Sequence, residues 1–288
     1  LKPRMASPLL LIMLVIFSSN IIRSLSDPRA TEAALVCTNK TSSQSDRQVY
    51  VASFLAAMDA ISPLVARQGY GGVVNGTGNN TVYAFGECMK DLSQTDCNLC
   101  FAQCKTQILR CLPFQRLTRG GRLFYDGCYL RYDDYMFFNE SLDAEDKTVC
   151  GVNDFGGNQS LFKANVAQLV RNMSVEAPKT DGFFKGFVNR GNLTVYGLAQ
   201  CWEFVNGTSC EKCLKDSVSR IGSCPPKDEG RVLNAGCYLR YSTKKFYDNS
   251  STTAPSGNGG DFSLNLISYF ARSYIEYLQT CHLIDSMR

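Results

Sequence analysis

Cysteine is the residue type in this sequence whose number and spacing offer the most chemistry. The chain has 14 cysteines among 288 residues, but only one histidine and one tryptophan. Cys97 and Cys100 are separated by two residues, with Cys88 before them and Cys111 after them. Such a group could form a four-thiolate zinc site, a redox-active dithiol or part of a disulfide framework. The redox state of the cellular compartment separates these alternatives, because zinc and dithiol sites need reduced cysteines whereas disulfides form under oxidising conditions.

The N-terminal region indicates entry into the secretory pathway. Residues 9–17 form an unbroken apolar run, and the Ser-Leu-Ser segment at 24–26 has the small residues that signal peptidase accepts. A run of this length is too short for a membrane span, which needs about 20 apolar residues. We therefore predict a signal peptide over residues 1–26, an extracellular (apoplastic) location and disulfide-bonded cysteines.

Asn-x-Ser/Thr triplets agree with secretion, since they are the acceptor sequence for N-glycosylation. The chain contains nine such candidates: Asn39, Asn75, Asn79, Asn139, Asn158, Asn172, Asn192, Asn206 and Asn249.

An internal repeat organises the sequence. Five cysteines, from Cys37 to Cys111, recur 113 residues later, and a sixth, Cys128, recurs 109 residues later as Cys237. The hexapeptide Gly-Cys-Tyr-Leu-Arg-Tyr occurs at 127–132 and again at 236–241. We predict a tandem duplication with domains at 30–140 and 146–248, each of ordinary domain size rather than a solenoid unit.

The apolar spacing within one copy predicts an α+β domain. Apolar residues recur at helical spacing between Val51 and Val65, with a counterpart at 162–173. A Gly/Asn-rich turn is expected at 69–80, then a strand at 82–85. A second helix, capped by Asp96, is expected to run to about Arg110, with its counterpart at 209–221. Strands are expected at 122–125 and 128–132, so two helices pack on an antiparallel sheet.

The helical placement of the cysteines limits their pairing without deciding it. Cys97 and Cys100 lie three residues apart on the second expected helix, where Cβ atoms are about 5–6 Å apart. A disulfide needs about 3.8 Å, so each should bond to another element. Six cysteines in a domain allow 15 connectivities, and spacing alone selects none of them.

The Cys-x8-Cys-x2-Cys spacing, 51 residues after a leading cysteine and present in both copies, resembles the plant ginkbilobin-2-homologous domain, also called DUF26 or stress-antifungal. The sequence of residues 129–141 is similar to that of ectodomains of cysteine-rich receptor-like kinases. The resemblance implies two tandem domains, each with two helices packed on a five-stranded antiparallel sheet and three disulfides. It implies the pairs Cys37–Cys111, Cys88–Cys97, Cys100–Cys128, Cys150–Cys224, Cys201–Cys210 and Cys213–Cys237.

The same resemblance points to a carbohydrate site. A family member binds mannose through an Asn, an Arg and a Glu, and the first domain has Thr38, Arg122 and Asp133 at these positions. Together with nearby Tyr132 they could hold a sugar. The favoured interpretation is that Arg122 and Asp133 form an ordinary surface ion pair. The second domain has Gly151, Arg231 and Ser242 there and is poorly equipped.

Several functional classes are disfavoured by composition. Without residues 1–26 the chain has 27 basic and 26 acidic residues, so a nucleic-acid partner is not expected. The single histidine, His282, lies outside both repeats, which disfavours Ser–His or Cys–His catalysis. We expect no enzyme activity, cofactor or metal.

The segment 249–288 is predicted to be a linker followed by an atypical C-terminal tail. Its apolar part contains Arg272 and Glu276, and each would cost about 2.5–3.5 kcal/mol at a membrane centre. We therefore expect no membrane span. Cys104 and Cys281 remain outside the implied pairs and could bridge each other or another chain.

The sequence thus favours a secreted, non-enzymatic recognition protein of the plant stress or defence type. It would bind a carbohydrate or protein partner through exposed sheet faces and the surface between the domains. Association with itself or with another chain is left open. The alternatives are the ectodomain of a cysteine-rich receptor-like kinase, a mannose-binding antifungal lectin and a secreted thiol oxidoreductase.

Overall fold

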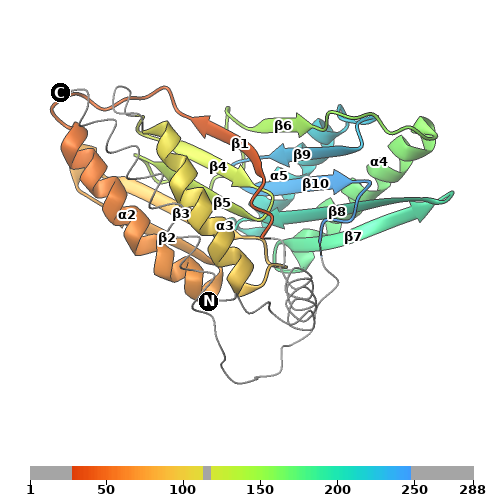
Figure 1. Cartoon of the computed structure of the whole chain (residues 1–288), viewed down its shortest axis with the longest axis horizontal. Coiled ribbons are helices and arrows are strands. Elements are labelled where there is room, and N and C mark those ends of the chain that lie inside the picture. The colour runs from red at the N-terminus through yellow and green to blue at the C-terminus, as the bar shows by residue number, and fades with distance from the viewer. Residues whose placement is uncertain (1–27, 113–117, 248–288) are drawn as a thin grey trace, which may run out of the picture. The chain divides into compact units, whose positions relative to one another are not determined.

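The structure, a computed structural model, describes residues 28–112 and 118–247 (Figure 1). The signal peptide predicted at 1–26 and the tail at 249–288 lie outside these residues. Both repeats belong to one compact unit that ends at Tyr247.

Repeat one consists of the elements from β1 to β5, and repeat two of those from β6 to β10 (Figure 1). In chain order, repeat one has β1 (Glu32–Cys37), α2 (Arg47–Gln68), β2 (Tyr70–Asn75), η1 (Gly78–Asn80), β3 (Val82–Cys88), α3 (Gln94–Gln107), η2 (Ile108–Cys111), β4 (Gly121–Tyr125) and β5 (Cys128–Asp133). Repeat two has β6 (Lys147–Cys150), α4 (Gln159–Glu176), η3 (Ala177–Lys179), β7 (Phe183–Arg190), β8 (Leu193–Cys201), α5 (Gly207–Ile221), β9 (Glu229–Leu233) and β10 (Cys237–Ser242).

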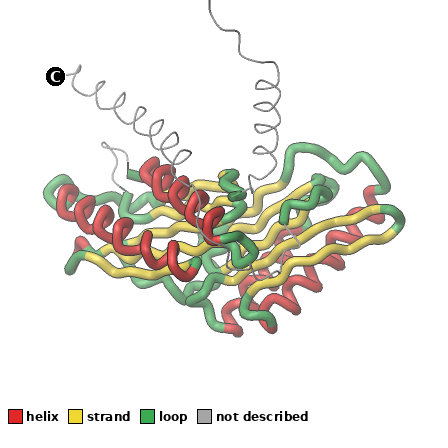
Figure 2. The backbone as a smooth tube through the Cα atoms, turned by 60° about the horizontal axis from the view of Figure 1, so that its bottom comes forward, coloured by secondary structure: helices red, strands yellow, loops and turns green. Residues whose placement is uncertain are grey.

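Each repeat has a five-stranded antiparallel sheet, with the order β1-β4-β5-β3-β2 in repeat one and β6-β9-β10-β8-β7 in repeat two. The helices α2 and α3 cover one face of the first sheet, and α4 and α5 cover one face of the second (Figure 2). The expected α+β class, with two helices on a five-stranded sheet twice and three disulfides per domain, is confirmed.

Two local predictions were wrong. Residues 70–75 form the edge strand β2 instead of part of a long turn, because Tyr70 to Asn75 pair in register with Val82 to Glu87. The cap of α3 is Ser93 rather than Asp96, since the Ser93 side chain accepts a hydrogen bond from the Asp96 N–H. Asp96 instead lies in the first turn, where its negative charge complements the helix dipole.

The long helix α2 is apolar enough to cross a membrane by length and composition, and it is the one such helix among the described residues. One face of this helix belongs to the core of repeat one. Tyr50, Phe54, Ile61 and Val65 are buried in the cluster between the helices and the sheet. Burial of four large side chains at about 1.5–3 kcal/mol each makes this face a strong anchor for the domain.

Disulfides connect strands of each sheet to the second helix of the repeat and to the turn that follows it. The bonded pairs are Cys37–Cys111, Cys88–Cys97, Cys100–Cys128, Cys150–Cys224, Cys201–Cys210 and Cys213–Cys237. These are the pairs that the family resemblance implies. The zinc and dithiol alternatives at Cys97 and Cys100 are excluded here, because both sulfurs are bonded to other elements.

Cys104 is the free cysteine of the described residues. It is fully buried in the core of repeat one, and burial raises the pKa of its thiol well above the usual value. Bridging to another chain would therefore require repeat one to open. Cys281 lies outside the described residues.

A third apolar cluster lies between the two repeats. It joins Phe85, Phe124 and Tyr129, from the sheet face of repeat one that the helices leave uncovered, to Leu198 and Tyr238 from the same face of repeat two. The expectation that the sheet faces are exposed was wrong at these positions. The two faces pack against each other, and this contact buries their aromatic and aliphatic side chains away from water.

Candidate functional site

A charged cavity of about 210 Å³ opens beside β4 and β5 of repeat one. Thr38, Arg122 and Asp133, the predicted carbohydrate-binding residues, all line it. Its other lining residues are Val36, Lys40, Gly121, Arg131, Asp134, Tyr135, Asp143 and Glu145.

Strand register explains why these side chains converge. Arg122 on β4 lies directly opposite Arg131 on β5, and Asp133 is two residues further along β5. Residues two apart in a strand point to the same face, so all three project away from the helices. Thr38 follows β1 and is held by hydrogen bonds from its N–H and its hydroxyl to the Gly120 carbonyl.

Arg122 does not form the surface ion pair with Asp133 that was the favoured interpretation. The Arg122 side chain is buried and pairs with two carboxylates of the segment between the repeats, Asp143 and Asp146. The distance from Arg122 Nη1 to Asp146 Oδ1 is 3.0 Å. Arg122 lines the cavity, but since both of its terminal nitrogens are paired with these carboxylates, its role is to position the inter-repeat segment.

Asp133 has a different partner, Arg131. Arg131 Nη2 donates to Asp133 Oδ2 over 3.2 Å, and to the Tyr135 hydroxyl over 2.7 Å, while Nη1 donates to Glu140. Burial raises the pKa of Asp133 to about 6, although Arg131 lowers it. A carboxyl that is neutral in acid and charged near neutrality can therefore act as donor or acceptor to a hydroxyl.

The expectation that Tyr132 contributes the aromatic ring of this site was also wrong. Tyr132 points to the opposite face of β5, where its hydroxyl bonds Thr118 in the core. Tyr135, which is 41% exposed, lies at the cavity instead. Strand alternation could have identified Arg131 and excluded Tyr132, because residues 131 and 133 share a face that 132 does not. The contributions of Tyr135 and Asp143 depend on loop paths and had no sequence signal.

The corresponding arginine of repeat two is part of the contact between the repeats. Arg231 donates to both carboxylate oxygens of Asp126 in repeat one, over 2.6 Å and 2.8 Å. The Tyr238 hydroxyl and Arg240 also contact Asp126. These contacts lower the pKa of Asp126 in spite of its burial. Ser242 occupies the position of Asp133.

Eight of the nine glycosylation candidates lie in the described residues, and Asn249 lies outside them. Asn75 is partly buried and the other seven are exposed. Asn158 and Asn206 are the N-caps of α4 and α5, with each Oδ1 accepting a backbone N–H. An attached glycan uses the amide nitrogen, so capping and glycosylation are compatible at both positions. Occupancy of these sites stays a prediction.

Comparison with known proteins identifies a family that matches this chain. The family model described as "Salt stress response/antifungal" matches residues 36–135 and 149–244. Cysteine-rich receptor-like protein kinase 2 of Arabidopsis thaliana is 36% identical over 244 residues, which are 83% of this chain and 36% of the relative. An antimicrobial ginkbilobin-2-like protein of Castanea crenata is 28% identical over 198 residues, 66% of this chain and 79% of that protein.

A solved structure has the same fold. The tandem DUF26 ectodomain of the cysteine-rich receptor-like protein PDLP8 of Arabidopsis thaliana matches with a TM-score of 0.61 at 18% identity, over 74% of this chain and 98% of that one. The chain spans 32–36% of the length of four receptor kinases that it matches. The chain therefore belongs to the salt stress response/antifungal (DUF26, ginkbilobin-2-homologous) family and carries two of its domains in tandem.

Proposed function

We propose that this chain is an extracellular recognition module of the plant stress or defence type, which binds a carbohydrate or protein partner without catalysing a reaction. Six disulfides suit an oxidising compartment. The matched relatives are named as receptor-like kinases and an antimicrobial protein, and the matched solved chain is an ectodomain.

The observation that carries the proposal is the charged cavity of repeat one. It combines a carboxyl acceptor (Asp133) that Arg131 holds in place, a cationic donor (Lys40) and an exposed aromatic ring (Tyr135). Such a set suits a small polyhydroxylated group, because vicinal hydroxyls both donate and accept hydrogen bonds. At about 210 Å³ the cavity is smaller than the roughly 300–1,000 Å³ of pockets for drug-sized ligands, so a single sugar ring is the favoured occupant.

A glycan array with mannose-containing and other neutral sugars tests this site. Asp133→Asn removes the acceptor charge at almost constant volume, and Ser242→Ala at the equivalent position of repeat two is the matched control. We expect at least about tenfold weaker binding for Asp133→Asn and none of that loss for the control. Arg122→Ala is less informative, because it leaves Asp143 and Asp146 without their cation.

Absence of any glycan signal from the folded protein would remove the carbohydrate part of the proposal, including a mannose-binding lectin. An unchanged signal for Asp133→Asn would place the sugar elsewhere.

A second candidate, the ectodomain of a cysteine-rich receptor-like kinase, is favoured by the kinases among the relatives and by the third of their length that this chain spans. Sequencing the transcript beyond Arg288 separates the two. A transmembrane and kinase coding region in frame supports the ectodomain, and a stop codon excludes it.

A further inference from the structure

The contact between the repeats is built from equivalent positions. Gln200 of repeat two is the counterpart of Glu87, 113 residues earlier, and Glu203 is the counterpart of Lys90. In the structure Gln200 Nε2 donates to Glu87 Oε1 over 2.8 Å, and Lys90 Nζ lies 3.3 Å from Glu203 Oε2. Each residue thus meets its own counterpart, as residues on the axis of a two-fold symmetric dimer do.

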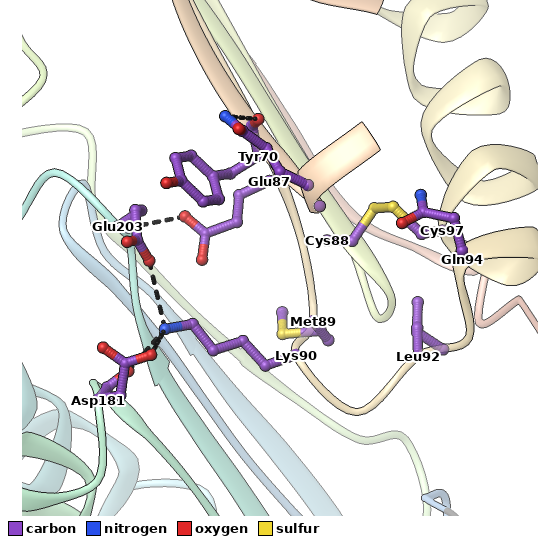
Figure 3. Close-up of a pocket in the computed structure, with 12 residues that line it drawn as sticks. Tyr70, Glu87, Cys88, Met89, Lys90, Leu92, Gln94, Cys97, Asp181 and Glu203 are labelled. Atoms are coloured by element: carbon purple, nitrogen blue, oxygen red, sulfur yellow. Dashed lines mark hydrogen bonds and ion pairs between the residues drawn. A yellow bond between two sulfur atoms is a disulfide. The ribbon is translucent and has the colours of Figure 1, made fainter. Parts of the chain in front are cut away.

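The backbone follows the same symmetry. The Lys90 N–H donates to Gln200 Oε1 over 2.8 Å, and the Glu203 N–H donates to Glu87 Oε2 over 2.7 Å. These two bonds are images of each other under exchange of the repeats. Figure 3 shows Glu87 directed toward Glu203, and the Lys90 side chain reaching to Glu203 and Asp181. The pseudo-two-fold relation therefore extends from the side chains to the loops that carry them.

We propose that the inter-repeat face of repeat one is a heterotypic docking surface, which accepts the face of a repeat two and rejects a second repeat-one face. Pairing of two repeat-one faces would place Glu87 against Glu87 and Lys90 against Lys90. Glu87 is only 2% exposed, so a second carboxylate there would meet little solvent screening. In the heterotypic pair an amide faces the carboxyl and an anion faces the cation.

Pairing of two repeat-two faces is disfavoured for a different reason. Asp126 accepts from Arg231 and also contacts Arg240, whereas its counterpart in repeat two is Ala235. Two repeat-two faces would leave these guanidinium groups with Glu229 of their own repeat as carboxylate partner but without Asp126, so their buried positive charges would be less fully compensated. Asp126 by itself would favour a repeat-one pair, so rejection of that pair rests on positions 87 and 90.

The charged groups around Glu87 are Lys90 and Glu203, with Asp181 beyond Lys90. Desolvation by burial raises the pKa of Glu87 to about 8, and the Glu203 N–H and Lys90 lower it less. The carboxyl is thus already costly to ionise with an amide opposite. A second carboxyl in place of the amide would add like-charge repulsion to that cost.

A residue swap across the axis in the full chain tests the proposal. Gln200→Glu should raise the unfolding equilibrium constant at pH 8 by about tenfold or more, because two carboxyls then face each other. The double variant Glu87→Gln/Gln200→Glu restores the amide–carboxyl pair in mirror image and should return the urea midpoint to near that of the wild type. Glu87→Gln alone is the matched control and should be at least as stable as the wild type at pH 8.

A second cycle, at the partly exposed Lys90–Glu203 pair, covers the case in which Gln200→Glu does not fold. It is run in an Asp181→Asn background, because Asp181 also pairs with Lys90 and would otherwise contribute to the effect of each substitution at position 90. Lys90→Glu and Glu203→Lys should each lower the urea midpoint, and the double variant should recover it. If the double variants are as destabilised as the sum of their single variants, or if Gln200→Glu matches the wild type at pH 8, the proposal is wrong.

Discussion

The face of the sheet on which a side chain lies determines its interaction partners in this protein. Arg122 and Arg131 are neighbours on β4 and β5, and burial forces each to find carboxylates. Arg122 takes Asp143 and Asp146 from the inter-repeat segment, and Arg131 takes Asp133 and Glu140. The guanidinium of Arg131 also lies 4.1 Å above the Phe137 ring. The charged cavity is what remains between these satisfied pairs.

Removal of the Asp126 carboxylate should be strongly destabilising. Asp126→Asn removes the negative charge that Arg231 and Arg240 share and leaves one acceptor oxygen where there were two. Glu229 still pairs with both arginines, so the loss should reach up to about 3–5 kcal/mol, the cost of breaking a buried ion pair from one side. Urea unfolding at pH 7 measures this. Asp154→Asn, which breaks the exposed pair with Lys227, is the control and should change stability by less than about 1 kcal/mol. Equal effects of the two substitutions would contradict the assignment.

Glu87 should make the stability of the protein depend on pH. Its pKa is raised in the folded state to about 8 from an ordinary value of 4.5, so the folded state holds the proton more tightly. The resulting stabilisation is full below about pH 4.5 and is lost as the pH rises toward 8. The difference between wild type and Glu87→Gln should therefore change by up to about 1.4 kcal/mol per pH unit in this window. Urea midpoints from pH 4 to pH 9 provide the measurement, and parallel curves would refute it.

At the scale of elements, disulfides and close packing hold the second helix of repeat one on the sheet. The cysteines of α3 are spaced so that Cys97 reaches β3 and Cys100 reaches β5. Gly86 on β3 lets Phe101 of the same helix lie close to the sheet, since a Cβ there would come within 2.4 Å of the ring. Helix α3 is therefore held by two covalent bonds and one close ring contact.

The long-loop disulfides should stabilise the repeats more than the short-loop ones. Cys37–Cys111 and Cys150–Cys224 each join residues 74 apart, whereas Cys88–Cys97 and Cys201–Cys210 each join residues 9 apart. In the chain-entropy model the losses on replacement by Ser pairs are about 4.5 and about 2.7 kcal/mol. Thermal unfolding of all four double-Ser variants gives a matched comparison, with each repeat as the control for the other. A larger loss for the short loops in both repeats would exclude this entropic account.

At the scale of the whole molecule, the two repeats share one apolar cluster. The single tryptophan of the chain, Trp202 of repeat two, is 2% exposed and stacks on Tyr129 of repeat one with ring centroids 4.5 Å apart. Tryptophan emission thus reports contact between the repeats, while far-UV circular dichroism reports both sheets and all four described α-helices.

The repeats should unfold together in the wild type and separately when their contact is weakened. We expect the tryptophan and circular dichroism transitions in urea to coincide for the wild type, which is the usual test of a cooperative transition. For Tyr129→Ala the tryptophan emission should shift at lower urea than the dichroism, because the stacking partner and its buried area are lost. Phe162→Ala, in the core of repeat two, is the control and should move both signals.

Much of the architecture follows from the sequence because it depends on local spacing. The 113-residue offset of the cysteines, the helical spacing between Val51 and Val65 and the repeated hexapeptide specify two α+β domains before any contact is known. Strand β2 escaped prediction, since its Gly71 and Gly72 have the composition of a turn and pairing with β3 makes them a strand. Local composition cannot report a partner strand.

The sequence by itself determined the duplication, the class of each domain and the residue types available for binding. Only the tertiary structure decided which charges meet. Arg122 pairs with Asp143 and Asp146 rather than Asp133, and Arg231 pairs with Asp126 of the other repeat, 105 residues away. Spacing specifies secondary structure because the helix and strand periods are local, whereas an ion pair forms wherever folding brings two buried charges together. For this reason the contact between Glu87 and Gln200, at equivalent positions of the two repeats, becomes visible only in the folded chain.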